Sequence, residues 1–340
     1  MKVLVTGAGG FLGSALVERL LAHGHRDLRC LMRQRRVPEW AERARQQFPE
    51  ASIEIVYGNL LVPADAAAVV DRVDLIFHAA AAMRGAPADL FLNTVVASRN
   101  LLDALADGRK RRVVLVSSFG VYGTASLPAG AVVNEETPLE PHPELRDSYS
   151  HAKLRQERLF REYQEQLGFE LVVVRPGVIY GPGGGAISAR VGQSLLGVFF
   201  NFGHGNLLPL SYVDNCAEAL VIAGNVSESA GQAYNAHDDG LPTCRQYLRE
   251  FKRQVQPMRS LPVPYLALLL GSWAVERYYR WSRGQLPAAF TVYTTKTLWK
   301  GTRFDNSKLK KLGWRPIVTT AEGMRRTFAW HKAQLQKQAR

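Results

Sequence analysis

The chain has 340 residues, of which 46% are hydrophobic and 21% are charged. This composition supports one large folded unit or two closely joined lobes, and it excludes wholesale disorder. The three cysteines, Cys30, Cys216 and Cys244, are scattered without metal-ligand spacing, which favours reduced thiols and no metal site. The net charge of +13 fits a phosphate-bearing cofactor, an anionic membrane surface or an ordinary solvated surface. No nucleic-acid partner is expected, because the basic residues are dispersed and no nucleic-acid motif accompanies them.

Strand-like and helix-like stretches alternate through the first 180 residues. The predicted strands are 2–6, 28–32, 52–57, 75–79, 113–117 and 171–175, and the predicted helices are 11–23, 90–106 and 149–167. This alternation is typical of a parallel sheet with helices on both faces, so we expect an α/β fold with a Rossmann-type, doubly wound sheet. The first apolar run is too short for a secretion signal, which favours a cytoplasmic protein.

The alternation weakens after Tyr180, where the glycine-rich stretch Gly181–Gly185 predicts a break. Further on, the stretch 212–224 resembles a strand end that continues into a helix. We therefore expect a nucleotide-binding domain and a smaller C-terminal substrate lobe, between which the chain crosses more than once. The domain would comprise residues 1–180 with a return segment at about 212–235, and the lobe residues 181–211 and 236–340.

The segment Thr6–Gly13 follows the first predicted strand and opens the first predicted helix, with glycines at positions 7, 10 and 13. Such glycines permit a tight turn, a close approach of the backbone to a pyrophosphate, and tight packing of helix on strand. The helix N-terminus would present free N–H groups and a positive dipole end to the phosphates. The position at the first strand–helix junction predicts a dinucleotide site rather than an empty glycine turn.

The residues after the second predicted strand indicate which dinucleotide is bound. An NAD enzyme usually has Asp or Glu there to bind the ribose 2′-hydroxyl group. In this chain the strand ends in Arg33, followed by Arg35 and Arg36, whereas Asp27 precedes the strand. Because a guanidinium group matches a 2′-phosphate in charge and geometry, we predict NADP rather than NAD, with Arg33 as the cofactor ligand. A solvated basic loop is the simpler alternative.

An acid/base group is predicted around Tyr149 and Lys153, whose four-residue spacing places both on one face of a helix. A nearby ammonium group lowers the pKa of a phenol and so suits tyrosine to proton transfer. The pair alone is a weak signal. Ser118, however, follows the predicted strand 113–117, and ligand sites of such sheets lie at the carboxyl ends of strands.

Together these motifs resemble the extended short-chain dehydrogenase/reductase superfamily, in particular its epimerase/dehydratase members and its 3β-hydroxysteroid dehydrogenase-like branch. The matching segments spread over residues 1–215 in the order and spacing of the family. They are 6–13, 58–60, 78–81, Asn93, 117–123, 149–153, 175–182 and 212–214. The last third is only loosely similar, although Gly313–Pro316 resembles a closing motif of the family.

The resemblance implies a role for each matching residue. Tyr149 would be the general acid/base, Lys153 would hold the nicotinamide ribose, Ser118 would orient the substrate oxygen, and Asn93 would support the catalytic site. The family usually has Asp where this chain has Asn59, whose side-chain oxygen can still accept a hydrogen bond from the adenine. The implied cofactor-binding residues are Gly7, Gly9, Gly10, Phe11, Leu12, Gly13, Arg33, Asn59, Leu60, Ala79, Ala80, Ala81, Tyr149, Lys153, Pro176 and Val178. The family often forms homodimers through helices such as 90–106 and 149–167, so a homodimer is also implied.

Two departures from the family pattern narrow the expected reaction. Phe119-Gly120 occupies the place of the Asp-Glu pair of the dehydratases, so dehydration is not expected. Leu207–Ser211 occupies the place where nucleotide-sugar epimerases usually have an arginine that clamps a diphosphate. We therefore expect an NADP-dependent oxidoreductase that interconverts a ketone and a secondary alcohol on an apolar or lipid-linked substrate. The alternatives are a nucleotide-sugar or glycolipid epimerase or reductase in polysaccharide synthesis, and a non-catalytic dinucleotide-binding sensor.

The segment 261–281 contains the most apolar run of the chain. This run is shorter than the ~20 residues of a membrane-spanning helix, and two prolines interrupt its start, so we expect no crossing of a bilayer. A buried core helix of the substrate lobe is the simpler interpretation. The alternative is a peripheral contact with the inner membrane face, for which aromatic residues and flanking arginines are suited. These residues are Trp273, Tyr278, Tyr279 and Trp281, with Arg259, Arg277, Arg280 and Arg283.

Overall fold

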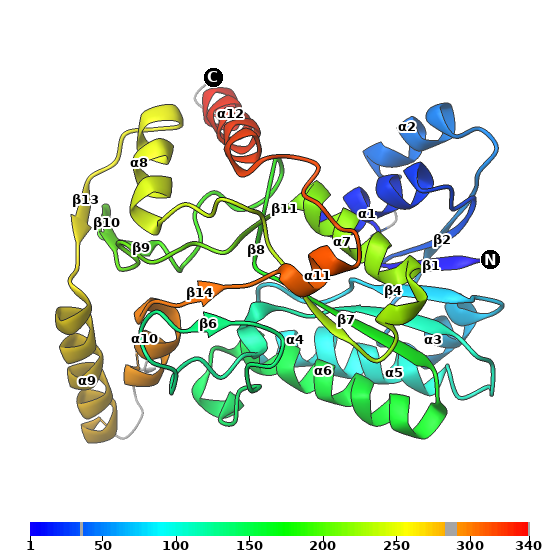
Figure 1. Cartoon of the computed structure of the whole chain (residues 1–340), viewed down its shortest axis with the longest axis horizontal. Helices are drawn as coiled ribbons and strands as arrows, with labels where there is room; N and C mark the ends of the chain where they lie inside the picture. Colours follow the sequence, from blue (N-terminus) through cyan, green and yellow to red (C-terminus); the bar gives the residue numbers. More distant parts are fainter. Residues whose placement is uncertain (35–36, 283–290, 339–340) are drawn as a thin grey trace.

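A seven-stranded, wholly parallel sheet forms the centre of the computed structural model, which describes residues 1–34, 37–282 and 291–338 (Figure 1). The strand order is β12-β7-β5-β4-β1-β2-β3. The strands are β1 (Val3–Thr6), β2 (Asp27–Met32), β3 (Ser52–Tyr57), β4 (Leu75–His78), β5 (Arg112–Val116), β7 (Glu170–Pro176) and β12 (Ala233–Ala236). The order in which the strands are added reverses between β1 and β4, because β2 and β3 extend the sheet on one side of β1 and β4, β5 and β7 extend it on the other. Such a switch point opens a crevice at the carboxyl ends of the two strands. The predicted Rossmann-type α/β fold is confirmed.

Helices cover both faces of this sheet, and successive residues of each strand pack on opposite faces. In β1, Val3 and Val5 lie in one apolar cluster and Leu4 lies in the other, as the two-residue period of a strand requires. The first cluster includes side chains of α1 (Phe11–Ala22), α2 (Glu39–Gln47) and α7 (Val213–Asn225). The second includes side chains of α3 (Pro63–Val70), α5 (Ala97–Asp103) and α6 (Ser148–Leu167).

The predicted helix 90–106 is interrupted. A short helix, α4 (Pro87–Phe91), leads into a π-helical turn, η1 (Leu92–Val96), before α5 begins at Ala97. A π-turn accommodates one more residue than an α-helical turn, so it changes the directions of the side chains within it. The turn includes Asn93, and the consequence for that residue is described below.

The part of the structure beyond the main sheet, called the substrate lobe after its expected role, has a separate core in which Tyr180, Tyr247 and Phe328 are buried. Its strands are short, which explains why the sequence pattern indicates few of them. They are β8 (Val178–Tyr180), β9 (Gly192–Leu195), β10 (Val198–Asn201), β11 (Leu210–Tyr212) and β13 (Ser260–Pro262), with β6 (Val132–Val133) and β14 (Arg303–Phe304) forming a separate pair. The remaining elements are α8 (Cys244–Gln254), α9 (Tyr265–Trp281), α10 (Val292–Trp299), α11 (Ser307–Lys311), α12 (Thr320–Gln338), and the 3-10 turns Phe119–Val121, Pro143–Leu145 and Ser227–Ser229.

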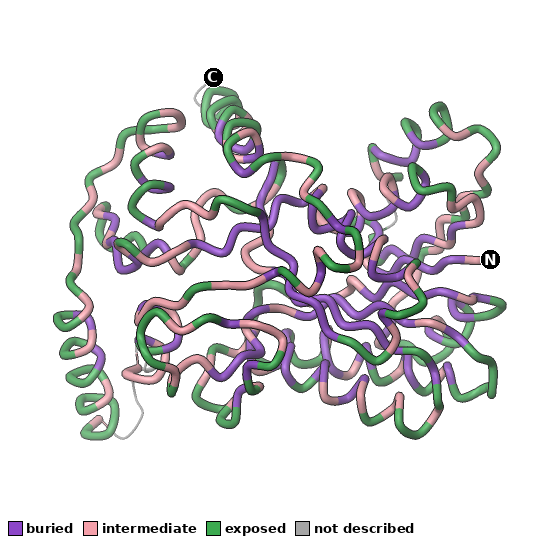
Figure 2. The backbone as a smooth tube through the Cα atoms, in the orientation of Figure 1, coloured by how far each residue is buried: buried purple, intermediate pink, exposed green. Residues whose placement is uncertain are grey.

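Helix α9 lies at the edge of the molecule, and Figure 2 shows that much of its length is exposed. Only Leu268 and Ser272 among its 17 residues are buried. The simpler interpretation of this segment, a buried core helix, is therefore wrong. Among the described residues, no helix combines the length and apolar character needed to cross a bilayer.

Candidate active site

The glycine turn between β1 and α1 has almost no free space. Gly7 has a φ of +72°, which favours glycine, and its carbonyl accepts a hydrogen bond from the Gly10 amide at 2.9 Å. A Cβ atom on Gly13 would lie 2.1 Å from the same carbonyl oxygen, so only glycine lets α1 approach the turn this closely. Because α1 begins at Phe11, its first N–H groups have no partner within the helix. The turn is therefore suited to bind an anion.

A cleft of about 610 Å³ lies beside this turn. The predicted cofactor residues that line it are Gly7, Gly9, Gly10, Arg33, Asn59, Leu60, Ala79, Ala80 and Ala81. Phe11, Leu12 and Gly13 form the adjoining first turn of α1, and the Phe11 ring packs near Gly181 and Gly184. Of the other predicted cofactor residues, Pro176 ends β7 and Val178 begins β8. Trp40 and Arg43 of α2 also line the cleft, although no sequence motif indicates them. The turn, the size of the cleft and its cationic rim fit a dinucleotide.

Arg33 lies directly after β2, and its Nη1 donates a hydrogen bond to Asn93 Oδ1 at 2.7 Å. Asp27 begins β2, at the end of the strand away from the cleft, which agrees with its expected absence from a ribose site. The cleft is also lined by the carboxylate residue Glu39 at the start of α2. The other two predicted basic residues, Arg35 and Arg36, lie outside the described residues.

The two asparagines of the site lie at the cofactor end. Asn59 Oδ1 accepts a hydrogen bond from the Leu61 amide at 3.1 Å, which holds the side chain at the wall of the cleft. The Asn93 side chain contacts Arg33 and the Asp89 carbonyl, and it is not joined to the catalytic pair. The π-turn gives a physical reason, because it changes the direction in which residue 93 points.

Ser118 and Tyr149 meet at the carboxyl end of β5. Ser118 Oγ accepts a hydrogen bond from the Gly120 amide at 3.0 Å, and the same side chain affects the pKa of the Tyr149 phenol. Tyr149 stands in the first turn of α6, whose N-terminus is capped by Asp147. Burial raises the pKa of Tyr149 to about 12, the hydrogen bond from Ser118 opposes this shift, and the Asp147 charge adds to it. The phenol is therefore protonated at neutral pH and suited to donate a proton.

Lys153 is buried one helical turn further along α6. Its Nζ donates hydrogen bonds to the Val116 carbonyl at 2.5 Å and to Gln156 Oε1 at 2.6 Å. Burial lowers the pKa of Lys153 to about 7, while the Glu157 charge opposes this shift. The prediction that Lys153 lowers the pKa of Tyr149 is wrong for this structure, because the amine is directed to other partners and burial dominates at the phenol.

A buried chain of hydrogen bonds extends from Lys153 to the glycine turn. Gln156 Nε2 donates to Ser98 Oγ at 2.8 Å, and Ser98 Oγ is 2.9 Å from His78 Nε2. The other ring nitrogen, His78 Nδ1, is 2.9 Å from Thr6 Oγ1. Burial lowers the pKa of His78 to about 3, so its ring is neutral. These hydrogen bonds connect α6 to the glycine turn, and no motif in the sequence indicates that Gln156 and Ser98 take part in them.

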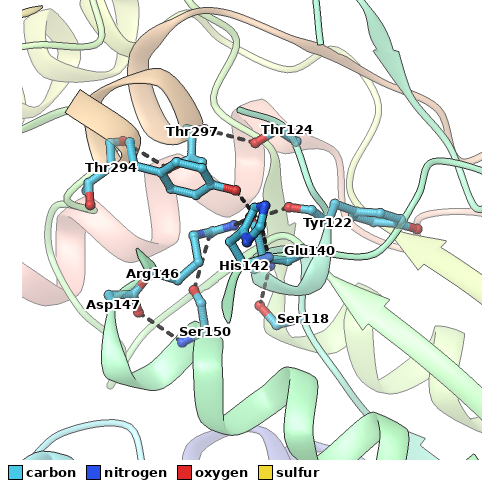
Figure 3. Close-up of polar contacts among 12 residues, drawn as sticks. Ser118, Tyr122, Thr124, Glu140, His142, Arg146, Asp147, Ser150, Thr294 and Thr297 are labelled. Atoms are coloured by element: carbon cyan, nitrogen blue, oxygen red, sulfur yellow. Dashed lines mark hydrogen bonds and ion pairs between the residues drawn. The ribbon is translucent and has the colours of Figure 1, made fainter. Parts of the chain in front are cut away.

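The substrate lobe contacts the loop that leads into α6. Arg146 and the buried Glu140 form an ion pair at 3.1 Å, and Tyr293 of α10 donates a hydrogen bond to Glu140. Thr124 Oγ1 donates to the Thr297 carbonyl of the same helix at 3.3 Å. Figure 3 shows these residues gathered beside Ser118 and Asp147. Helix α10 is thus attached to the segments that surround the candidate catalytic tyrosine.

Arg190 is a half-buried cation in the loop between β8 and β9. Its carbonyl accepts hydrogen bonds from Trp299 Nε1 at 3.1 Å and from Cys244 Sγ at 3.5 Å, which fixes the backbone. Within the described residues, its guanidinium group forms no hydrogen bond or ion pair. Burial, together with the Arg146 charge, lowers the pKa of Arg190 to about 10, and Asp147 opposes the shift. The group therefore remains charged at neutral pH, and the charge of Asp147, the N-cap of α6, stabilises that charge.

Comparison with known proteins places these features in a wider context. The family model described as "NAD dependent epimerase/dehydratase family" matches residues 3–236. The chain is 26% identical to 2-alkyl-3-oxoalkanoate reductase of Shewanella oneidensis, over 96% of this chain and 85% of the relative. It is 26% identical to the decarboxylating sterol-4-alpha-carboxylate 3-dehydrogenase of Candida albicans, over 97% of each chain.

Epimerases are also among the relatives. UDP-glucose 4-epimerase of Mycolicibacterium smegmatis is 28% identical, over 98% of this chain and 99% of the relative. The structure of Thermus thermophilus UDP-glucose 4-epimerase in complex with NAD has a TM-score of 0.70 and 22% identity, covering 98% of this chain and 99% of that one. At this level of identity, the solved structure supports the shared fold alone.

Proposed function

Because the chain belongs to the NAD-dependent epimerase/dehydratase family, we propose that it is an NADP-dependent oxidoreductase that interconverts a ketone and a secondary alcohol on an apolar or lipid-linked substrate. The proposal depends above all on the placement of Ser118 and Tyr149. Ser118 follows the carboxyl end of β5, and Tyr149 stands in the first turn of α6, which contacts the 3-10 turn that begins after Ser118. This pair has the composition and position needed to bind a substrate oxygen and exchange a proton with it.

In the proposed reaction, each side chain of the site has a separate role. Tyr149 donates its phenolic proton to the ketone oxygen during reduction and accepts it back during oxidation. Ser118 donates a hydrogen bond to the same oxygen and so holds it near the phenol. Lys153, fixed by Val116 and Gln156, binds the nicotinamide ribose and keeps it next to Tyr149. A dinucleotide in the cleft would supply or accept the hydride.

The choice of NADP rests on cations at the ribose end of the cleft. Arg33 and Arg43 both line it, and a guanidinium group can bind a 2′-phosphate through two hydrogen bonds. Asn93 holds the Arg33 side chain from one side at 2.7 Å. Glu39 is the residue that would favour NAD instead, by accepting a hydrogen bond from a free 2′-hydroxyl group.

Arg190 supports a narrower substrate class, an apolar 3-oxo or 3-hydroxy acid. Its guanidinium group is charged and forms no ion pair within the described residues, although the charge of Asp147, two residues before Tyr149, acts on its pKa. A substrate carboxylate close to the reacting carbon would provide that partner. The names of the reductase and sterol dehydrogenase relatives also describe substrates whose carboxylate is attached to the carbon next to the reacting carbon.

The nucleotide-sugar alternative is supported by the epimerase relatives. A diphosphate needs cationic or N–H donors, yet Leu207–Ser211 offers no basic side chain. Leu208 and Leu210 are buried in the core of the substrate lobe. An arginine that binds a diphosphate could not take their place unless this segment rearranged.

A substrate screen separates these proposals. NADPH and NADH consumption would be measured with long-chain 3-oxo acids, their methyl esters and nucleotide ketosugars, and epimerisation of UDP-glucose would be followed in parallel. We expect NADPH-dependent reduction of the acids and a lower kcat/KM for the esters. Epimerisation of the sugar nucleotide without net consumption of cofactor would overturn the proposal, as would binding of dinucleotide without turnover of any member of the panel.

A further inference from the structure

Helix α9 presents a stripe of large apolar side chains to solvent. Leu266, Leu270, Trp273 and Trp281 have exposed fractions of 71%, 68%, 56% and 78%. At 3.6 residues per turn, these four residues share one face of the helix, opposite to the buried Leu268 and Ser272. Side chains of this size and number are uncommon on the outside of a water-soluble helix and mark an interaction surface.

The orientation of this stripe is fixed from the inner side of the helix. Ser272 Oγ is 2.6 Å from Thr295 Oγ1 of α10, and Glu276 accepts a hydrogen bond from the Val292 amide at 2.8 Å. Leu268 packs in a cluster with Phe202 and Trp299. These contacts hold the polar and buried face of α9 toward the lobe, so the tryptophans on the opposite face stay outside.

Basic residues accompany the apolar stripe. Between residues 245 and 281 the chain has seven basic and two acidic residues. A groove of about 590 Å³ beside α8 is lined by Arg249, Lys252, Arg253, Pro257, Met258 and Arg259. Helix α8, strand β13 and helix α9 follow one another along the same edge of the molecule in Figure 1. Leu261, 54% exposed, lies on β13 between the groove and the stripe.

We propose that α9 and the basic groove beside α8 form a surface that binds an anionic lipid bilayer. The stripe would lie in the interface, where a peripheral helix buries its apolar face ~5–10 Å deep. Trp273, Tyr278, Tyr279 and Trp281 are residue types that settle at the depth of the headgroups, and the arginines match anionic lipid in charge. A second copy of the chain is a poorer occupant, because it would bring the same excess of positive charge to the contact. Of the residues suggested by the sequence for this contact, Arg283 lies outside the described residues.

The surface is connected to the candidate active site through one helix. Helix α10 packs on α9 through Thr295 and, on another side, reaches Glu140 through Tyr293. Glu140 in turn pairs with Arg146, three residues before Tyr149. A bilayer on α9 would therefore be linked through α10 to the loop that leads into α6. The membrane proposal itself does not depend on the reaction, since it rests on exposure and charge alone.

Co-sedimentation with lipid vesicles tests the proposal on the full chain. Vesicles of phosphatidylcholine with 30% phosphatidylglycerol would be compared with pure phosphatidylcholine at low and high salt. We expect most of the protein to pellet with the anionic vesicles at low salt and to be released at ~1 M salt, where the Debye length falls to about 3 Å. Recovery in the supernatant at low salt with both compositions would overturn the proposal.

Matched variants identify the surface that is responsible. Trp273→Ser with Trp281→Ser should lower the vesicle partition coefficient at least about 10-fold, because the double change removes two large apolar side chains from the face that would enter the interface. The control Val132→Ser with Ile317→Ser alters side chains that are 53% and 46% exposed elsewhere, and it should bind normally. An unchanged bound fraction in the tryptophan variant would overturn the assignment.

The oligomeric state distinguishes a protein partner from a lipid one. Light scattering after size exclusion should give the same mass for the wild type and the tryptophan variant. A dimer that dissociates in the tryptophan variant, combined with weak vesicle binding, would assign the stripe to a second copy and overturn the bilayer proposal. Because both tryptophans are exposed, the thermal unfolding midpoint of the double variant should match that of the wild type. A matching midpoint would exclude misfolding as the cause of lost binding.

Discussion

The nucleotide-binding half and the edge of the substrate lobe use apolar residues in opposite ways. Around the glycine turn the packing is so close that a single added methyl group at Gly13 would meet a carbonyl oxygen at 2.1 Å. On α9, by contrast, only two of 17 residues are buried, and the largest side chains lie outside. The first region determines the chemistry by holding backbone and side chains in one arrangement, whereas the second provides a surface that other molecules can reach.

This comparison predicts that changes in the first region affect every substrate, and that changes in the lobe affect only some. Tyr149 and Lys153 stand on a helix anchored in the main sheet, and Arg190 stands in a loop of the lobe. Substitution of Tyr149 should therefore have the largest effect, followed by changes at Arg190 and Arg33.

Tyr149→Phe should lower kcat for all substrates by ~10²–10⁴-fold, the usual contribution of a positioned acid, and leave NADPH affinity unchanged. Steady-state kinetics and a fluorescence titration of NADPH would measure the two effects. Tyr163→Phe is the matched control, because its hydroxyl on the same helix bonds only the exposed Asp103. Near-normal turnover in Tyr149→Phe would show that the acid lies elsewhere.

Arg190→Met should raise KM for 3-oxo acids by about 10–100-fold, the value of a hydrogen bond to a charged group, and change KM for the methyl esters much less. Kinetics with acid and ester pairs of equal chain length would measure this. Arg245→Met, on the exposed side of α8, serves as the control. An equal rise in KM for acid and ester would show that Arg190 does not bind a substrate carboxylate and has a structural role instead.

Arg33→Ala should weaken NADPH binding by about 10–100-fold and spare NADH, since only the 2′-phosphate meets the guanidinium group. Titration with each cofactor would measure the difference. Arg45→Ala, a change on the exposed side of α2, controls for the loss of one positive charge near the cleft. Tighter binding of NADH than NADPH by the wild type would instead favour the Glu39 rim and NAD.

How far the sequence predicts the molecule also differs between the two regions. The strands of the main sheet that were expected begin and end within a residue or so of the observed bounds, because buried parallel strands are continuous apolar runs closed by turn residues. The family motifs likewise identify Ser118, Tyr149, Lys153 and the glycine turn. These features depend on local spacing, which a single sequence displays.

Other features depend on contacts between distant residues and have no local signal. The π-turn at Leu92–Val96 has the same apolar spacing as a regular helix, so the change at Asn93 could not be predicted. Gln156 meets Ser98 across 58 positions of the chain, and the short strands of the lobe are held by pairing rather than by propensity. The simpler interpretation of α9 as a buried helix was wrong for the same reason, since an apolar run does not reveal which of its faces is covered.

The close packing around Lys153 lowers the stability of the folded protein by an amount that depends on pH. Burial lowers the pKa of Lys153 from 10.5 to about 7, so between these values the unfolded chain binds more protons than the folded one. Stability therefore rises with pH across this window, and the penalty of the buried charge is fully present below pH ~7. Lys153→Met removes the charge at every pH, but it also removes the donor to Val116 and Gln156, a loss that does not vary with pH. Consequently the thermal midpoint of the variant, relative to wild type, should be most favourable at pH 6 and decline by a few degrees toward pH 10. Lys332→Met, at an exposed position, should show no such trend. A Lys153→Met difference independent of pH would mean that folding does not lower the pKa of Lys153.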